Sequence, residues 1–156
     1  TEKLFQRRIR MFVIKYLFSV LEHYYIGPFA TMENAETYFR FFGYAPNANV
    51  EGVWTRPGNM LLATPPLHMT VVELIAPPGQ TSTLHCGQGF VVKDLKSENL
   101  GHVGPFVAED DAKAFLSSQG YWSSMFDPCL WQKGRATYLP LYDHEATIVP
   151  LHGWCR

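Results

Sequence analysis

The sequence has no excess of positive charge and few charged residues overall. Lysine and arginine together number 13, against 14 aspartate and glutamate residues, and the sequence pI is about 6.5. A protein that binds nucleic acid neutralises phosphates with surplus basic side chains, so this balance argues against a dedicated nucleic-acid binder. Charged residues make up 17% of the chain and hydrophobic residues 47%. That composition excludes a disordered chain, a coiled coil and a collagen-like fibre.

Cysteine is also scarce. Cys86, Cys129 and Cys155 are too few and too irregularly spaced for a disulfide scaffold, and no C-x-x-C pair exists for zinc binding or thiol exchange. We expect three ordinary, partly buried thiols. A Cys86–Cys129 disulfide stays open, because a sequence does not give the distance between two Cα atoms.

The sequence lacks a hydrophobic run long enough to cross a membrane. The longest candidate, residues 11–21 (MFVIKYLFSVL), follows Arg7, Arg8 and Arg10 as the apolar part of a signal peptide would. Lys15 interrupts it, no small-x-small cleavage site follows, and it is shorter than the roughly 20 residues that a span needs. We therefore expect a soluble protein, cytoplasmic or virion-associated, in which this segment belongs to the core.

Aromatic residues, by contrast, are abundant at 15%, with 11 Phe, 8 Tyr and 4 Trp. Part of the surplus is a repeated pattern. Residues 27–44 (GPFATMENAETYFRFFGY) and 104–121 (GPFVAEDDAKAFLSSQGY) align without a gap. Gly-Pro-Phe, a central alanine and Gly-Tyr recur at the same spacing, which indicates an internal duplication.

The match extends in both directions from this segment. Upstream, FVIK at 12–15 matches FVVK at 90–93, and downstream Trp54 matches Trp131. The alignment shifts by one residue between elements, where loops absorb such changes. The predicted organisation is an N-terminal arm over 1–10, a first repeat over 11–78, a linker over 79–89 and a second repeat over 90–156.

Each repeat predicts the element order β-β-α-β-β. Gly-Pro-Phe is interpreted as the start of the helix, with Thr31 as a cap in the first repeat and an acidic first turn in the second. Gly43 and Gly120 are expected to end the helices. Residues 6–23 also fit a helical rhythm, but a strand from about Arg10 is favoured because the matching segment is too polar for a helix. The fold class is α+β: two tandem ββαββ-like units, each with one helix on an antiparallel sheet, related by an approximate twofold axis.

The run of strand, Gly-Pro-Phe, helix with a central alanine and Gly-Tyr resembles the pattern of SPOR domains. It is also similar to small bacterial and phage proteins with a Gly-Pro-Phe core. The resemblance covers residues 27–44 and 104–121. It implies, as one alternative, a small α/β module that binds the glycan strands of peptidoglycan.

Two histidines suggest a second alternative. His68-Met69-Thr70 resembles the His-x-Thr motif of the 2H phosphoesterases, in which one histidine is the general base, another the general acid, and threonine hydroxyls hold the phosphate. His144 aligns with His68, but its threonine, Thr147, comes one residue late. In a strand, such a slip turns the hydroxyl to the opposite face.

Other catalytic or metal-binding constellations are weaker. Residues 143–145 (Asp-His-Glu) with His152 contain metal-ligand types, yet neighbouring residues of a strand point to opposite faces. Cys86 stands beside His85 without a pattern that assigns a base. We therefore predict no metal and no cofactor.

The favoured prediction is a non-enzymatic binding or assembly protein, of the structural, decoration or inhibitor kind that bacteria and phages encode. It would contact a protein partner or a second copy of itself through aromatic surfaces and sheet edges, and neither nucleic acid nor membrane. The candidate binding residues are Tyr24, Tyr25, Tyr38, Phe41, Trp54 and Trp131.

Overall fold

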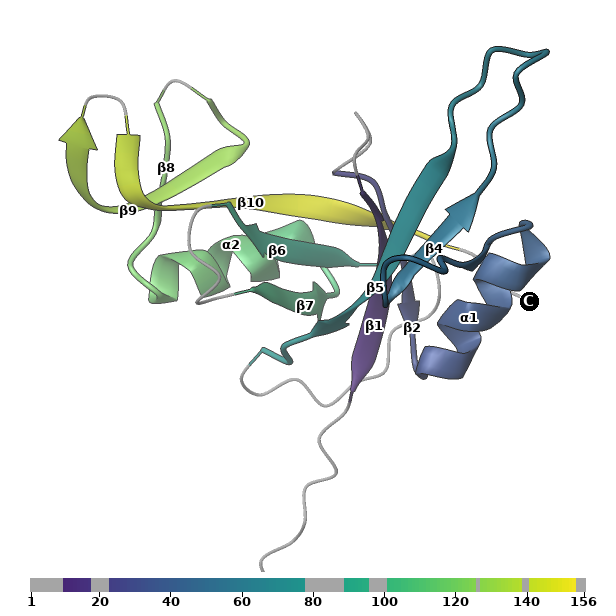
Figure 1. Ribbon diagram of the computed structural model, residues 1–156. Helices are drawn as coiled ribbons and strands as arrows, with labels where there is room; N and C mark the ends of the chain where they lie inside the picture. Colours follow the sequence, from purple (N-terminus) through teal and green to yellow (C-terminus); the bar gives the residue numbers. More distant parts are fainter. Residues whose placement is uncertain are drawn as a thin grey trace, which may run out of the picture.

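The computed structural model describes residues 10–17, 23–77, 89–95, 101–125, 127–138 and 141–153 (Figure 1). Within these residues the protein is a mixed α and β structure with two helices and a ten-stranded sheet. The predicted mixture of helices and strands is confirmed. A single sheet shared by both halves of the chain, in place of one sheet for each, was not predicted.

The two halves contain the same succession of elements: two strands, a helix and three strands. The first half consists of β1 (Met11–Leu17), β2 (Tyr25–Phe29), α1 (Met32–Phe41), β3 (Ala45–Pro46), β4 (Val53–Arg56) and β5 (Leu67–Leu74). The second consists of β6 (Phe90–Asp94), β7 (His102–Phe106), α2 (Glu109–Ser118), β8 (Trp122–Ser123), β9 (Leu130–Tyr138) and β10 (Leu141–His152). Each half thus has a short strand, β3 or β8, beyond the predicted order.

Six of the strands close into a ring. Antiparallel pairs join β5 to β1, β1 to β2, β10 to β6 and β6 to β7. The end of β10 pairs in parallel with β2. Ile75, directly after β5, closes the ring by a parallel bridge to Val103 of β7. Its amide donates to the carbonyl of His102 at 2.8 Å, and its carbonyl accepts from the amide of Gly104 at 3.0 Å. The chain at the end of the last strand of each half therefore pairs with a strand of the other half. The long β10 extends from one half to the other (Figure 1).

Corresponding strands make corresponding pairs. Lys15 of β1 lies opposite Thr70 of β5, and Lys93 of β6 lies opposite Thr147 of β10. The hydroxyls of Thr70 and Thr147 each donate over 2.8 Å to the carbonyl of the residue just before β4 and β9, respectively. Thr70 and Thr147 therefore have the same strand partner type and the same kind of hydrogen bond, and residues of the two halves can be compared by their distance from these threonines.

The helices begin and end for local reasons. The hydroxyl of Thr31 accepts from the amide of Asn34 at 3.1 Å, so the predicted cap of α1 is confirmed. Ala108 precedes α2 without a side-chain cap, and an acidic first turn favours the positive end of the helix dipole. Gly43 and Gly120 follow the helices with φ of 81° and 88°, a left-handed conformation that favours glycine.

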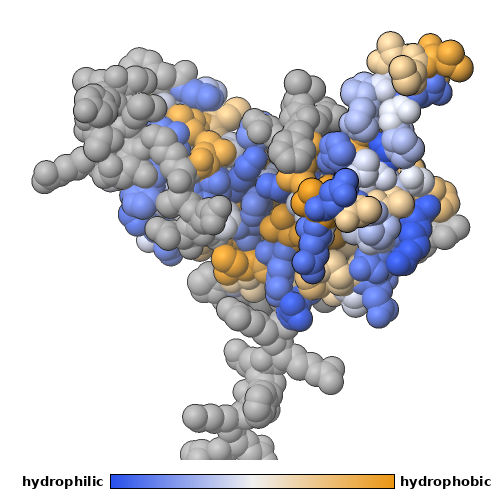
Figure 2. Space-filling model, in the orientation of Figure 1, coloured by the Kyte–Doolittle hydropathy of each residue, from blue (hydrophilic) through white to orange (hydrophobic). Residues whose placement is uncertain are grey.

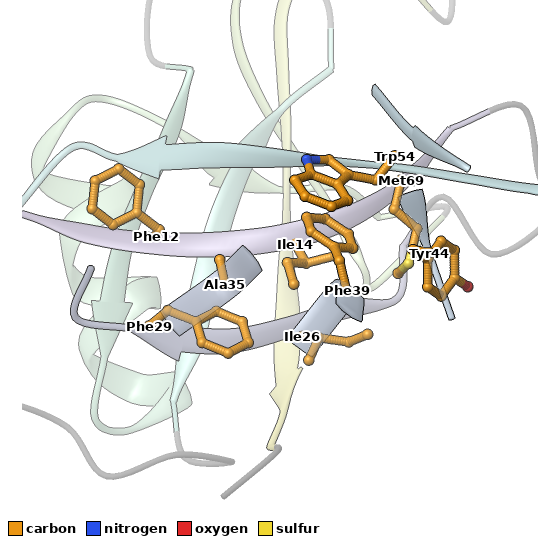
Figure 3. Packing of buried hydrophobic residues seen from close by; sticks show 9 residues of the cluster. All are labelled: Phe12, Ile14, Ile26, Phe29, Ala35, Phe39, Tyr44, Trp54 and Met69. Carbon is orange, nitrogen blue, oxygen red and sulfur yellow. The ribbon is translucent and has the colours of Figure 1, made fainter. Parts of the chain in front are cut away.

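The apolar side chains form three cores. In the first, α1 packs against its half of the sheet, and Figure 3 shows the ring of Phe39 against that of Trp54, at 4.8 Å between centroids. In the second, α2 packs against β6, β7 and β10. The central core takes residues from both halves: Met11, Val13, Tyr25, Leu74, Val91, Val149 and Leu151. Alternation along the strands places it on the face opposite to the helices.

The Gly-Pro-Phe segments differ from the prediction, because they lie inside β2 and β7 and the helices start later. Gly27 and Gly104 have φ of 148° and 155°. A Cβ at these positions would lie 3.1 Å from the carbonyl of Phe12 and 3.0 Å from that of Phe90. The register shifts directly after Phe12 and Phe90 in the paired strands. Glycine therefore permits a close approach of two paired strands at the register shift, which the sequence pattern did not reveal.

The expected strand near the N-terminus is confirmed over Met11–Leu17. Residues 1–9, residues 18–22 and most of the expected linker lie outside the described residues. No helix in the described part of the chain is long and apolar enough to cross a membrane.

Candidate binding surface

Six aromatic residues gather where α1 ends and β2 begins. This aromatic face consists of Tyr16, Tyr24, Tyr38, Phe41, Phe42 and Tyr44. Ring centroids lie 4.7 Å apart for Tyr38 and Phe42, 5.0 Å for Phe41 and Phe42, and 6.0 Å for Tyr16 and Tyr24. Phe41 is 54% exposed, and Tyr24 and Phe42 are each 37% exposed. Water therefore reaches one side of a connected set of rings.

Two tyrosines of the aromatic face, Tyr38 and Tyr44, have a raised pKa and therefore keep a neutral hydroxyl. Burial raises the pKa of Tyr38, and the nearby Tyr16 and Tyr44 raise it further. Burial and Tyr16 also raise the pKa of Tyr44, against the opposing effect of the Arg56 guanidinium, which lies 5.2 Å from the centre of the Tyr44 ring. Tyrosine, phenylalanine and arginine are residue types that are enriched in protein interfaces.

A second apolar feature lies at the end of the loop between β4 and β5. Figure 1 shows this hairpin projecting from the molecule, and Figure 2 shows hydrophobic side chains at its end. Met60, Leu61 and Leu62, here called the apolar tip, are 97%, 96% and 72% exposed. The side-chain carbonyl of Asn59 accepts from the amide of Leu61 at 2.9 Å, and the hydroxyl of Thr64 accepts from the amide of Asn59 at 2.9 Å. Polar side chains thus hold the backbone of the tip while its apolar side chains stay exposed.

The six candidate binding residues fall into two groups. Tyr24, Phe41 and the half-buried Tyr38 belong to the aromatic face. Tyr25 and Trp54 are buried in cores, and Trp131 is half-buried against the core of α2. Those three side chains already contribute to the fold. A binding role for Tyr24, Phe41 and Tyr38 stays a prediction that their position favours.

The candidate catalytic histidines lie on different faces of the sheet. In β5, His68 and Thr70 lie on one face of the strand. The residues between and beside them, which pack in the α1 core, lie on the other face. His144 shares a face of β10 with Ala146, which packs in the α2 core. His68 lies two residues before Thr70. The residue two before Thr147 is Glu145, so the strand pairs place Glu145, and not His144, at the position that matches His68. The alignment of the two histidines was therefore one residue out of register.

The threonines of the phosphoesterase alternative, Thr70 and Thr147, do occupy matching places, but each donates to a backbone carbonyl. His68 Nδ1 lies 2.9 Å from the hydroxyl of Thr55, which accepts from the side-chain amide of Asn47 at 3.0 Å. These polar groups hold strands and loops together, which is a structural use.

The described residues contain no group of three or more His, Cys, Asp or Glu side chains that could hold a metal ion. Cys129 is a free thiol, and it is exposed, whereas a partly buried one was expected. Cys86, with which the sequence analysis left a disulfide open, lies outside the described residues, as does Cys155.

A polar cluster lies on the same face of the sheet as the central core. The hydroxyl of Tyr25 is 2.9 Å from Nε2 of His102, and the Nζ of Lys93 lies 5.8 Å from the centre of the Tyr25 ring. Lys15 and Lys93 are both close enough to lower the pKa of His102. Lys15, Tyr25, Lys93 and His102 are here called the central cluster. Sequence reasoning considered Lys15 as an interruption of an apolar run and aligned it with Lys93, but it did not predict a cluster of these residues with Tyr25 and His102.

Burial, followed by the charges of Lys15 and Lys93, lowers the pKa of His102 from 6.5 to about 4, against the opposing effect of Asp94. Since the unfolded chain binds this proton more readily, stability should fall as the pH drops from about 6.5 towards about 4. We expect urea unfolding to show that this part of the loss is absent in His102→Gln. An equal acid loss in both proteins would contradict the neutral, buried state of this imidazole.

Comparison with known proteins adds no relationship: no protein family, no curated protein and no solved structure matches this chain. The candidate surfaces therefore rest on the chemistry of their own residues. The apolar tip was not predicted, because its three apolar residues have no periodic pattern. The aromatic face could be predicted in part, because the first half has aromatic residues, such as Tyr16, Tyr24 and Phe41, whose aligned positions in the second half are not aromatic.

Proposed function

We propose that the protein is a non-enzymatic assembly protein whose copies bind one another. In this proposal the apolar tip of one copy contacts the aromatic face of the next. The observation that carries it is the presence of both features, a projecting apolar hairpin and an exposed aromatic surface, on one chain. Such a protein would serve as a structural, decoration or inhibitor component of a bacterial or phage assembly, within a cell or a virion.

We further propose that the chain is a tandem duplication with approximate twofold symmetry, with repeats over 11–78 and 90–156. The matching succession of elements and the matching strand pairs support this. The exchange of strand ends and the shared central core mean that the repeats would work as one unit.

The comparison between repeats separates what the fold needs from what it does not. Tyr44 has a matching buried aromatic residue, Tyr121. By contrast, the places of Tyr16, Tyr24, Phe41 and Phe42 are taken in the second half by Asp94, Gly101, Ser118 and Gln119. Because the second half builds the same elements without aromatic residues there, the shared succession of elements does not require aromatic side chains at these four places. Exposed apolar groups, such as Phe41, are typical of interaction surfaces.

A contact between two different surfaces is heterologous, so it joins copies head to tail and leaves a tip and a face available at the ends. The tip is small and projecting, and its backbone is held by Asn59 and Thr64, so little conformational entropy is lost on binding. Aromatic side chains are preferred anchors for an apolar partner. These properties favour a second copy as the occupant of the aromatic face.

The phosphoesterase and glycan-binding alternatives stay predictions without a supporting observation. The two histidines lie on different faces, and the threonine hydroxyls are engaged with the backbone. The glycines of the Gly-Pro-Phe segments, which suggested a glycan-binding module, have a structural use at the close approach of paired strands.

Sedimentation velocity at increasing protein concentration tests the proposal. We expect the wild-type protein to form species heavier than the 17.8 kDa chain, and Leu61→Asp and Phe41→Asp each to remain monomeric, because a charge in an apolar contact is costly. Met125 is 96% exposed but belongs to neither surface, so Met125→Asp should associate like the wild type. A wild-type protein that stays monomeric at every concentration would contradict self-assembly.

A further inference from the structure

We propose that Met60, the first residue of the apolar tip, is a site of reversible oxidation by hydrogen peroxide, and that its sulfoxide weakens the binding of the tip. This inference rests on the proposed function, because it concerns the regulation of the contact between the tip and the aromatic face. Oxidation acts on free tips and so opposes the joining of copies.

The five methionines of the chain differ widely in exposure. Met60 and Met125 are 97% and 96% exposed, whereas Met32 is 43% exposed. Met11 and Met69 are buried in the central core and the α1 core, respectively. Because a peroxide has to reach the sulfur atom in order to react with it, Met60 and Met125 should be oxidised first.

The backbone at the end of the hairpin forms a defined turn. The side-chain carbonyl of Asn59 accepts from the amide of Leu61 at 2.9 Å and from that of Leu62 at 3.3 Å. Ala63 donates its amide to the carbonyl of Met60 at 3.3 Å and has φ of 53°, a left-handed conformation that residues other than glycine seldom adopt. The Met60 side chain therefore stays in contact with water on a turn that its neighbours hold in place.

The oxidation is a two-electron step on the thioether sulfur. The sulfur attacks one oxygen of hydrogen peroxide, so that an S–O bond forms and the O–O bond breaks. The proton of the transferred oxygen passes to the departing hydroxide, which leaves as water. A methionine sulfoxide reductase reverses the change by oxidising two thiols to a disulfide, and the oxygen again leaves as water.

A sulfoxide at position 60 is unfavourable in the contact with the aromatic face. The thioether of methionine makes favourable contacts with aromatic rings, which Phe41 and Phe42 expose on that face. The sulfoxide is polar, and burying it against such rings removes the hydrogen bonds that it makes with water. Because oxidation weakens binding, binding must equally oppose oxidation, and a bound tip should be protected from peroxide.

Peptide mass mapping after a brief exposure to hydrogen peroxide tests this protection. In dilute wild-type protein we expect Met60 and Met125 to gain oxygen at similar rates, since both are exposed. At concentrations where copies associate, Met60 should react several-fold more slowly than Met125, which belongs to neither surface. Phe41→Asp, whose aromatic face is impaired, should show no such protection at either concentration.

Sedimentation velocity of the oxidised protein tests the regulatory effect. Dithiothreitol after the treatment reverses sulfenic acids and disulfides of thiols such as the exposed Cys129, but leaves sulfoxides in place. We expect oxidation to weaken association of the wild type and of Met125→Leu roughly tenfold. Met60→Leu keeps an apolar side chain without sulfur, so its own affinity should be the same before and after the treatment. A methionine sulfoxide reductase should restore association of the oxidised wild type.

The two proposals can fail separately. A wild-type protein that is monomeric before oxidation contradicts self-assembly, and the regulatory role of Met60 with it. If the untreated wild type associates, the role of Met60 is overturned when conversion of Met60 to the sulfoxide leaves association unchanged. It is also overturned if oxidation weakens Met60→Leu as much as the wild type, or if Met60 reacts as fast as Met125 in the associated protein.

Discussion

Replacing Phe39 with alanine is expected to lower the free energy of unfolding by about 3–5 kcal/mol, the usual cost of truncating a buried phenylalanine. Phe39 is fully buried, and its ring stacks on Trp54 with centroids 4.8 Å apart. The substitution removes the larger of the two buried side chains of α1 and leaves a cavity. Urea unfolding followed by circular dichroism measures the change.

Phe41, two residues further along α1, provides the matched control. Its ring is 54% exposed and belongs to the aromatic face. Phe41→Ala should change the free energy of unfolding by less than about 0.5 kcal/mol, as exposed substitutions usually do. Similar losses in both variants would show that the two positions are not divided into core and surface as described.

Replacing Gly104 with alanine should cost about 3 kcal/mol or more, because two penalties add. The residue has φ of 155°, which side chains rarely adopt, and the new Cβ would lie 3.0 Å from the carbonyl of Phe90. Since Gly104 also donates the bond that closes the ring at Ile75, the two halves should loosen together. Denaturant unfolding monitored at separate probes in each half would report this.

Gly52 distinguishes backbone strain from crowding. Its φ is 80°, but a Cβ there meets nothing within 4 Å. Gly52→Ala should therefore cost only about 1–2 kcal/mol, the strain of a left-handed alanine. If Gly52→Ala destabilises as much as Gly104→Ala, the close approach of β7 to β6 is not the reason for glycine at position 104.

Local features of the fold could be predicted well. The cap at Thr31 and the glycines after both helices depend only on nearby residues, and the structure places them as expected. β1 could be recognised as a strand only through its counterpart in the second half, since its own spacing also fits a helix. Comparison between the halves thus carried information that a single segment lacked.

Long-range features could not be predicted. The parallel pairing of β10 with β2 and the bridge between Ile75 and Val103 join residues far apart in the sequence, and no local pattern specifies such partners. The error in aligning His144 with His68 has a similar cause. Matching identical residues favoured one register, whereas the strand pairs follow the apolar alternation that buries Ala146 and Met69.

The candidate sites also differ in how far the sequence predicts them. A surplus of aromatic residues in the first half was visible in the sequence, and the structure gathers several of them into one face. The central cluster was not predicted, because Lys15 and Lys93 lie in separate halves of the sequence and both come near His102 only in the folded ring. The apolar tip became recognisable through its measured exposure.

Mixing two defective variants tests the proposed assembly most directly. Leu61→Asp has an intact aromatic face and Phe41→Asp an intact apolar tip, so each alone should be monomeric. An equimolar mixture should form a complex of twice the 17.8 kDa chain mass, because the tip of one variant can still bind the face of the other. A mixture that sediments as monomers, while the wild-type protein associates under the same conditions, would contradict the contact between tip and face.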